Sequence, residues 1–101
     1  MRKVEMKRTL ISDLRRSIGK TVKVNGWVEA VRDQKTMQFV IVRDHTGLVQ
    51  VALERSKQNG QLNDVVDLLN VESAVEILGD VIEDARVNLG GIEIRLTGLQ
   101  V

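Results

Sequence analysis

The segment "TVKVNGWVEAVRD", residues 21–33, constrains the fold of this chain more than any other segment. Apolar residues such as Val22 and Val28 alternate in it with polar residues such as Lys23, which is the period of a half-buried β-strand. Gly26 stands in the middle, and a glycine inside a strand is typical of a bulge or a sharp bend. We therefore expect one long, bent strand that serves two sheets of a small barrel.

Four more strands and a helix follow this segment in a definite order. The segments "MQFVIVRD" (37–44) and "GLVQVALE" (47–54) read as strands two and three, joined by a turn from Asp44 to Gly47. Strands four and five are expected in "SAVEILGDVIEDA" (73–85), with a second bend at Gly79, and in "GIEIRLTGLQV" (91–101). Between them, "QLNDVVDLLN" (61–70) places Leu62, Val65, Val66 and Leu69 at helical spacing.

A short helix is expected before the first strand, in "SDLRRSI". Ser12 is suited to cap its first turn, and Gly19 is suited to end it. Its apolar contacts would come from Leu10, Ile11, Leu14 and Ile18.

The order of three strands, a helix and two strands is that of an OB-fold, a five-stranded Greek-key barrel. We therefore expect a mainly all-β fold with a helix between strands three and four and a short N-terminal helix. An unrelated small β-barrel or an α+β domain is the structural alternative.

The composition excludes several classes of protein. The 101 residues suit one domain, assigned to 1–101 with a short N-terminal extension at 1–8. The chain has no cysteine and a single histidine, His45, which we assign to a solvated turn. Thiolate or histidine metal sites and catalytic triads are therefore not expected. There is no apolar run long enough for a membrane span and no secretory signal, so we expect a cytoplasmic location and no membrane partner.

Charge is unevenly distributed along the sequence. Residues 1–50 carry 11 Lys and Arg against 5 Asp and Glu, whereas residues 51–101 carry 4 against 9. The first half is thus net +6 and the second net −5, which together give +1. This asymmetry hints at a polyanionic partner for the basic side. The basic residues Lys7, Arg8, Arg15 and Arg16 would add nonspecific attraction to phosphates or form an ordinary solvated helix face.

The period of two assigns side chains to the two faces of each strand. If Val49 and its apolar partners face the core, then Gln50 faces outward together with Leu48 and Ala52. In strand five, Glu93 lies opposite the apolar set and faces outward. Strand two is ambiguous, because both of its faces are largely apolar.

OB barrels bind ligands on the face of strands two and three, between the loops that join strands one to two and four to five. If Phe39 is on this surface, its ring offers a stacking platform for a base. Gln50 and Glu93 could hydrogen bond to the edges of unpaired bases, and Arg32 could contact phosphate or stack.

Each assignment has a structural alternative. Phe39 could be a core residue, and Gln50 and Glu93 could be ordinary solvated residues. We assign Trp27 to packing beside the bend. The segment "NLGG" (88–91) is read as a hairpin loop and not a phosphate cradle, because no helix follows it.

The segments "RTLISDL" and "GKTVKVNGWVEAVRDQKTMQFVIVRDHTGLVQVAL" resemble the N-terminal anticodon-binding domain of class IIb aminoacyl-tRNA synthetases, and most closely that of aspartyl-tRNA synthetase. The resemblance covers residues 8–101. It rests on Gly-Trp-Val, then Arg, a Phe seven residues on, Arg-Asp-x-x-Gly, and a Gln eleven residues after the Phe. The segment "GIEIRL" is similar to the last strand of that family. The spacing and "RDHTGLVQ" favour the aspartyl over the asparaginyl and lysyl members.

The resemblance implies roles for individual residues. Phe39 corresponds to the aromatic residue that stacks on an anticodon base, and Gln50 to the Gln that contacts the first and middle anticodon bases. Glu93 corresponds to the Glu that helps to recognise the neighbouring base, and Arg32 to an Arg near the middle uridine. Lys35 stands where many relatives have Gly, and it could reach phosphate. Lys35, Arg43 and Asn88 are the candidates for secondary RNA contacts.

The resemblance also implies partners. The expected partner is the anticodon stem-loop of a tRNA, that for aspartate, and a homodimer could form through the parent enzyme. No motif of the class II catalytic domain is present in the 101 residues. The chain alone is therefore not expected to be an enzyme, and ATP and Mg²⁺ would belong to a catalytic domain and not to this one. The alternatives are a module for protein interaction or dimerisation, built on Leu48 and Ala52, and a general binder of single-stranded nucleic acid.

Overall fold

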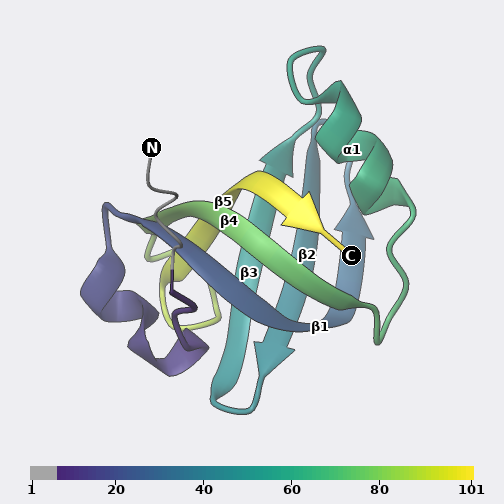
Figure 1. The fold of residues 1–101 in the computed structure, drawn as a ribbon. Coiled ribbons are helices and arrows are strands. Elements are labelled where there is room, and N and C mark those ends of the chain that lie inside the picture. The colour runs from purple at the N-terminus through teal and green to yellow at the C-terminus, as the bar shows by residue number, and fades with distance from the viewer. Residues whose placement is uncertain (1–6) are drawn as a thin grey trace, which may run out of the picture.

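Five strands close into a barrel in the computed structural model, which describes residues 7–101 (Figure 1). The elements are η1 (Ile11–Ser17), β1 (Thr21–Asp33), β2 (Met37–Asp44), β3 (Gly47–Glu54), α1 (Gly60–Asp67), β4 (Ala74–Glu83) and β5 (Ile92–Gln100). The strand order around the barrel is β1-β2-β3-β5-β4, and β4 pairs again with β1. This arrangement confirms the OB-fold, with the helix between β3 and β4 and a short helix at the N-terminal end.

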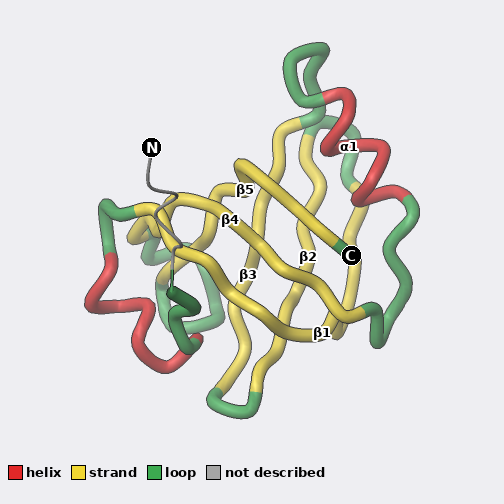
Figure 2. The backbone as a smooth tube through the Cα atoms, viewed as in Figure 1, coloured by secondary structure: helices red, strands yellow, loops and turns green. Residues whose placement is uncertain are grey.

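The first strand pairs with two neighbours, as its bend predicted. Its first half, from Thr21 to Trp27, pairs with β4, and its second half, from Trp27 to Asp33, pairs with β2 (Figure 2). The bulge lies between Val28 and Ala30 and not at Gly26. Gly26 is needed for a different reason. A Cβ atom there would overlap the carbonyl oxygen of Arg43 and lie 2.9 Å from Cγ1 of Val42.

The other long strand, β4, is irregular at its glycine. The pairing of β4 with β5 shifts register between Leu78 and Gly79, and a Cβ at Gly79 would overlap the backbone of Arg95. The prediction of a bend at Gly79 is therefore confirmed. The barrel is completed by a parallel pairing of β3 with β5, which brings Gln50 beside Glu93.

The core is aliphatic and fills the interior of the barrel. Alternate residues of every strand point inward, and the most deeply buried are Val24, Val28, Val42, Val49, Val51, Ile77, Val81 and Ile94. In β2, the inward residues are Val40 and Val42. This resolves the ambiguity of strand two, because Phe39 must then face outward.

The N-terminal helix differs from the prediction. It is a 3-10 helix that begins at Ile11, and Ser12 lies inside its first turn and does not cap it. The first turn is held instead by the β2–β3 hairpin, because the N–H of Ile11 donates to Asp44 Oδ2 at 2.9 Å and that of Ser12 donates to Thr46 Oγ1 at 3.0 Å. Ile11 and Leu14 pack into the core as expected, while Ile18 stays exposed. Gly19 ends the helix with a φ of 84°.

A buried polar network joins α1 to the barrel. The side-chain amide of Asn63 donates to Gln38 Oε1 at 2.8 Å, and Gln38 Nε2 donates to Asp67 Oδ1 at 2.8 Å. Arg55 completes the network by binding Asp67 at 2.8 Å and Asp33 at 2.7 Å. The helix is therefore fixed over one end of the barrel, opposite the end that η1 covers (Figure 1).

Within residues 7–101, no helix combines the length and the apolar character that crossing a bilayer requires.

Candidate functional site

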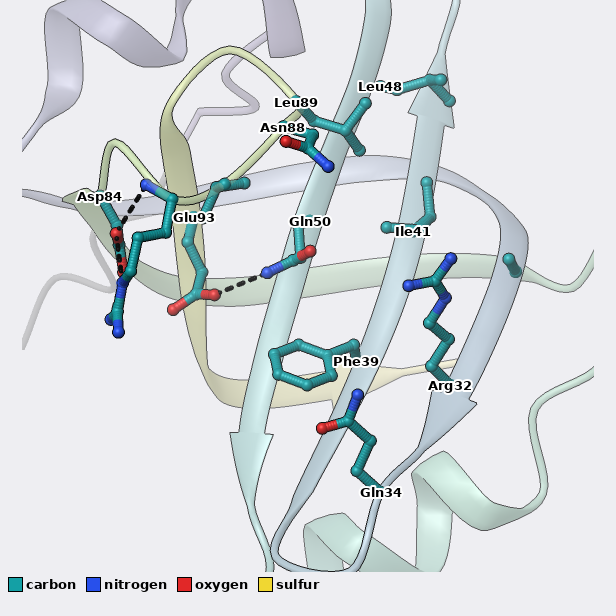
Figure 3. Close-up of a pocket in the computed structure, with 13 residues that line it drawn as sticks. Arg32, Gln34, Phe39, Ile41, Leu48, Gln50, Asp84, Asn88, Leu89 and Glu93 are labelled. Carbon is teal, nitrogen blue, oxygen red and sulfur yellow. Dashed lines mark hydrogen bonds and ion pairs between the residues drawn. The ribbon is translucent and has the colours of Figure 1, made fainter.

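A cleft of about 690 Å³ lies on the outer face of β1, β2 and β3 (Figure 3). Its floor is formed by the outward side chains of these strands, and its wall by the loop that joins β4 to β5. The volume falls within the range of roughly 300–1,000 Å³ that is typical of small-ligand sites. This is the face, between the same two loops, where the sequence predicted the site.

The strand register explains why the predicted residues converge. Arg32 of β1 pairs with Phe39 of β2, and Gln50 of β3 pairs with Glu93 of β5. Ile41, two residues after Phe39 on the same face of β2, pairs with Gln50 and so links the two pairs. All four side chains consequently line one cleft, although they come from four strands.

Phe39 is a partly exposed ring on the cleft floor. It lies between Gln34 and Gln50 in Figure 3 and points into the cleft. The alternative that this Phe is a core residue is therefore wrong. A fixed ring that is open on one side can stack on a planar group, which for nucleic-acid bases contributes about 1–3 kcal/mol per base.

Gln50 and Glu93 form one hydrogen-bonded unit. Nε2 of Gln50 donates to Oε1 of Glu93 at 2.8 Å (Figure 3). Glu93 faces outward as predicted, but it is only 8% exposed, on a strand that lies between β3 and β4. Arg95 Nε lies 3.7 Å from its other carboxylate oxygen. The pair thus presents acceptor oxygens at the cleft floor in a fixed orientation.

Arg32 provides a positive charge at one edge of the cleft. The ion pairs within residues 7–101 do not include it. Its exposed guanidinium lies beside Ile41 in Figure 3 and is open to an anionic ligand. An arginine in this setting can bind phosphate with two parallel hydrogen bonds.

The three secondary candidates lie in different places. Asn88 lines the cleft on the β4–β5 loop, at the end that Leu48 and Leu89 also line (Figure 3). Lys35 is exposed in the loop between β1 and β2 but does not line the cleft. Arg43 lies on the outer face further along β2, and its guanidinium is bound by two carboxylates, those of Glu29 and Glu72.

Sequence reasoning missed several residues of the cleft wall. Arg86 and Asp84 form a bidentate ion pair there, in which Nη2 and Nε of Arg86 donate to the two carboxylate oxygens at 2.9 and 3.0 Å. These hydrogen bonds lower the pKa of Asp84 to about 2. Gln34 and Leu89 also line the cleft. The one sequence feature that could have identified these residues is their position in the two loops that flank the binding face of an OB-fold.

Two expectations about exposure are wrong, although strand parity assigned the faces correctly. Trp27 is 47% exposed and does not pack beside the Gly26 bend. Ala52 is on the outer face but only 3% exposed, so it cannot join Leu48 in a surface patch. Leu48 itself is exposed as predicted, and so is His45 in its turn.

Residues 22–101 match the tRNA anticodon family, described as an OB-fold nucleic acid binding domain. Among curated proteins, the chain is 38% identical over 96 residues to an asparagine–tRNA ligase of Desulforamulus reducens, a match that covers 95% of this chain and 22% of that protein. It is 43% identical over 74 residues to an aspartate–tRNA(Asp/Asn) ligase of Natronomonas pharaonis, covering 71% of this chain and 17% of that protein.

A solved structure of asparaginyl-tRNA synthetase from Pyrococcus horikoshii, complexed with asparaginyl-adenylate, has the same fold over 96% of this chain and 22% of that chain. The TM-score is 0.84 and the sequence identity 27%. The chain spans about a fifth of the length of these relatives.

Proposed function

Because the chain belongs to the tRNA anticodon family of OB-fold nucleic acid binding domains, we propose that it binds the anticodon loop of a tRNA in the cleft of β1, β2 and β3. One observation carries the proposal. A ring, an amide and a carboxylate from three separate strands line the same cleft. Stacking and hydrogen bonding to unpaired bases are how OB-folds and similar modules read single-stranded RNA.

Each residue has a role in this proposal. Phe39 stacks on one anticodon base. The acceptor oxygens of Gln50 and Glu93 receive hydrogen bonds from the Watson–Crick edges of the bases next to it, because amino and imino groups there are donors. Arg32 binds phosphate at the edge of the cleft and so sets the register of the RNA without reading its sequence.

The proposed partner is the tRNA for aspartate. The turn "RDHTG" and the spacing that follows it support this choice over the tRNA for asparagine. Relatives of both kinds match the chain, and one of them is a ligase for both tRNAs by its name. As part of a larger protein, the domain would serve an aspartate–tRNA ligase whose catalytic domain uses ATP and Mg²⁺. It would itself bind RNA without a cofactor.

The test is a titration of a labelled anticodon stem-loop, followed by fluorescence anisotropy. Replacing Phe39 by Ala removes the stacking platform, and affinity should fall by about 5- to 150-fold, the equivalent of 1–3 kcal/mol. Leu68→Ala is the matched control, because Leu68 is 79% exposed on the α1 side, away from the cleft residues. Equal affinity of wild type and Phe39→Ala for the stem-loop would disprove the proposal.

A competition experiment addresses the choice of tRNA. By the genetic code, anticodons for aspartate and asparagine share their first two bases and differ only in the third. A stem-loop with the asparagine anticodon should therefore compete less well than the one with the aspartate anticodon, while a stem-loop with all three bases changed should hardly compete. If the stem-loops with the asparagine and the aspartate anticodon compete equally well, the domain binds both tRNAs and the assignment to aspartate alone is wrong.

A further inference from the structure

The exposed Trp27 lies on the same outer face as the cleft. The register of β1 with β2 pairs Trp27 with Arg43, and the register of β2 with β3 pairs Arg43 with Leu48. These three residues form a row across the three strands. Along β2, this row lies four residues from Phe39, or about 13 Å at the usual rise of a strand. The face that holds the cleft therefore continues to the indole ring.

The indole is held in a fixed position by its neighbours. The guanidinium of Arg43 lies over the Trp27 ring, 5.9 Å from its centroid. Arg43 in turn donates two hydrogen bonds of 2.9 and 2.8 Å to Glu72 and one of 2.8 Å to Glu29. Two carboxylates against one guanidinium leave this cluster with a net charge of −1, so Arg43 is not a free cation and the row contributes the aromatic surface of Trp27. A ring that is already held in place before binding loses less conformational entropy when the complex forms.

A second hollow, of about 360 Å³, lies against Trp27. Its wall also contains Arg8, Asn25 and His45. Within residues 7–101, no donor reaches Oδ1 of Asn25, although this atom is buried. A buried acceptor without a partner costs free energy, and a donor from a ligand would remove that cost.

We propose that this hollow, with Trp27, Asn25 and Arg8, is a second nucleobase subsite that takes an unpaired base of the RNA beyond the anticodon. The proposal rests on the function proposed above. The base stacks on the indole, its exocyclic amino group donates to Oδ1 of Asn25, and Arg8 binds the adjoining phosphate. OB-folds cover about 4–16 nucleotides of single strand, which is more than an anticodon supplies. A single strand that leaves Phe39 along the sheet face can therefore reach this site.

The sequence provides a direct probe, because Trp27 is the only Trp and the chain has no Tyr. Intrinsic fluorescence therefore reports on this ring alone. On titration with the anticodon stem-loop, Trp27 emission should be quenched with the same midpoint as the anisotropy signal of labelled RNA. The isolated anticodon trinucleotide should bind weakly and leave the emission unchanged at saturation. Quenching by the trinucleotide would mean that the ring responds to the cleft and would overturn the subsite.

Two variants complete the test. Trp27→Leu should lower affinity for the stem-loop by about 5- to 150-fold, whereas Trp27→Phe keeps a ring and should recover most of the loss. Leu68→Ala again serves as the control. Circular dichroism melting checks that each variant is folded, which is expected because the indole is exposed.

The outcomes separate this proposal from the one on which it rests. If Phe39→Ala weakens binding while Trp27→Leu binds like wild type, the subsite is overturned and the anticodon cleft stands. If no variant and no wild-type protein binds the stem-loop, both proposals fail. If Trp27→Leu changes only the oligomeric state in light scattering, the row is a contact between protein chains, which also overturns the subsite.

Discussion

Nε2 of Gln50 lies 2.8 Å from Oε1 of Glu93, so that two side chains 43 residues apart in sequence form one polar unit across the parallel pairing of β3 and β5. This contact fixes which end of the Gln50 amide faces Glu93. The carbonyl oxygen of that amide is then directed away from Glu93 and is free to accept a hydrogen bond. The orientation is set before any ligand arrives, which favours recognition of base donors.

We expect Gln50 and Glu93 to act together in binding. Gln50→Ala and Glu93→Ala should each weaken the stem-loop complex, and the double variant should lose less than the sum of the two. A double-mutant cycle should therefore give a coupling of about 0.5–3 kcal/mol, the range for residues in one network. Pairing either variant with Leu68→Ala should give additive losses. Additivity between Gln50 and Glu93 would contradict their action as a unit.

Gly26 should tolerate no side chain. Gly26→Ala would place a methyl group against the carbonyl oxygen of Arg43 and the side chain of Val42. Overpacking of this kind typically lowers the free energy of unfolding by about 1–3 kcal/mol. Gly60→Ala is the matched control, because nothing lies within 4 Å of its added Cβ and it begins α1. Urea unfolding should show loss for the first variant and none for the second.

Asp44 should make the stability of the chain sensitive to acid. Partial burial opposes its ionisation, but hydrogen bonds from Thr46 and from the N–H groups of Ile11 and Gly47 outweigh this and lower its pKa. A carboxyl group with a pKa lower in the folded than in the unfolded state stabilises the fold above its unfolded pKa, about 3.9. That contribution is lost as the pH falls through the lower, folded value.

Asp44→Asn should therefore lower the free energy of unfolding at pH 7 and make its fall between pH 5 and pH 2 shallower than in wild type. Urea unfolding at a series of pH values measures both effects. Asp64→Asn, which removes an exposed carboxylate on α1, is the control. If the free energy of unfolding of Asp44→Asn falls with pH as steeply as that of wild type, the stability of the turn does not depend on this charge.

The network under α1 should be sensitive to the loss of one partner. Asn63→Ala leaves Oε1 of the buried Gln38 without its 2.8 Å donor. An unsatisfied buried polar group costs about 1–3 kcal/mol, so thermal unfolding should occur at a lower temperature. The double variant Asn63→Ala/Gln38→Leu removes both polar partners and should recover part of the loss. If the double variant is less stable than Asn63→Ala, the loss of stability is not caused by a buried polar group left without a hydrogen-bond partner.

The sequence was a good guide to the strands because alternation reports burial directly. The bounds expected for the first three strands, 21–33, 37–44 and 47–54, are those of β1, β2 and β3. The outward direction of Gln50 and Glu93 followed from the same alternation, and the structure confirms both. The binding face followed from the order of elements, but alternation left the direction of Phe39 open, and only the family resemblance placed its ring on that face.

The remaining features depend on contacts that no local pattern encodes. Ser12 is an ordinary capping residue by type, but the hairpin supplies the acceptors that hold the first turn of η1. Trp27 is an exception, because it alternates with Val24 and Val28 as Asn25 does, so strand parity already indicated an outward ring and the packing assignment rested on residue type alone. Ala52 is buried on the outer face, where the register places this small residue between Phe39 of β2 and Arg95 of β5. The outcomes for Ser12 and Ala52 are set by residues distant in sequence.

The pairing of β1 with both β2 and β4 has a consequence for the order of folding. The hairpin of β2 and β3 can form early from adjacent residues, but the first half of β1 has no strand partner until β4 arrives from much later in the chain. Bringing the ends of such a long loop together costs conformational entropy before any stabilising contact forms, and this slows folding. Barrels with many distant strand pairings fold in milliseconds to seconds. Glu93 reaches Gln50 only when β5 joins the sheet. The proposed RNA-binding site should therefore be completed in the same kinetic step that closes the barrel.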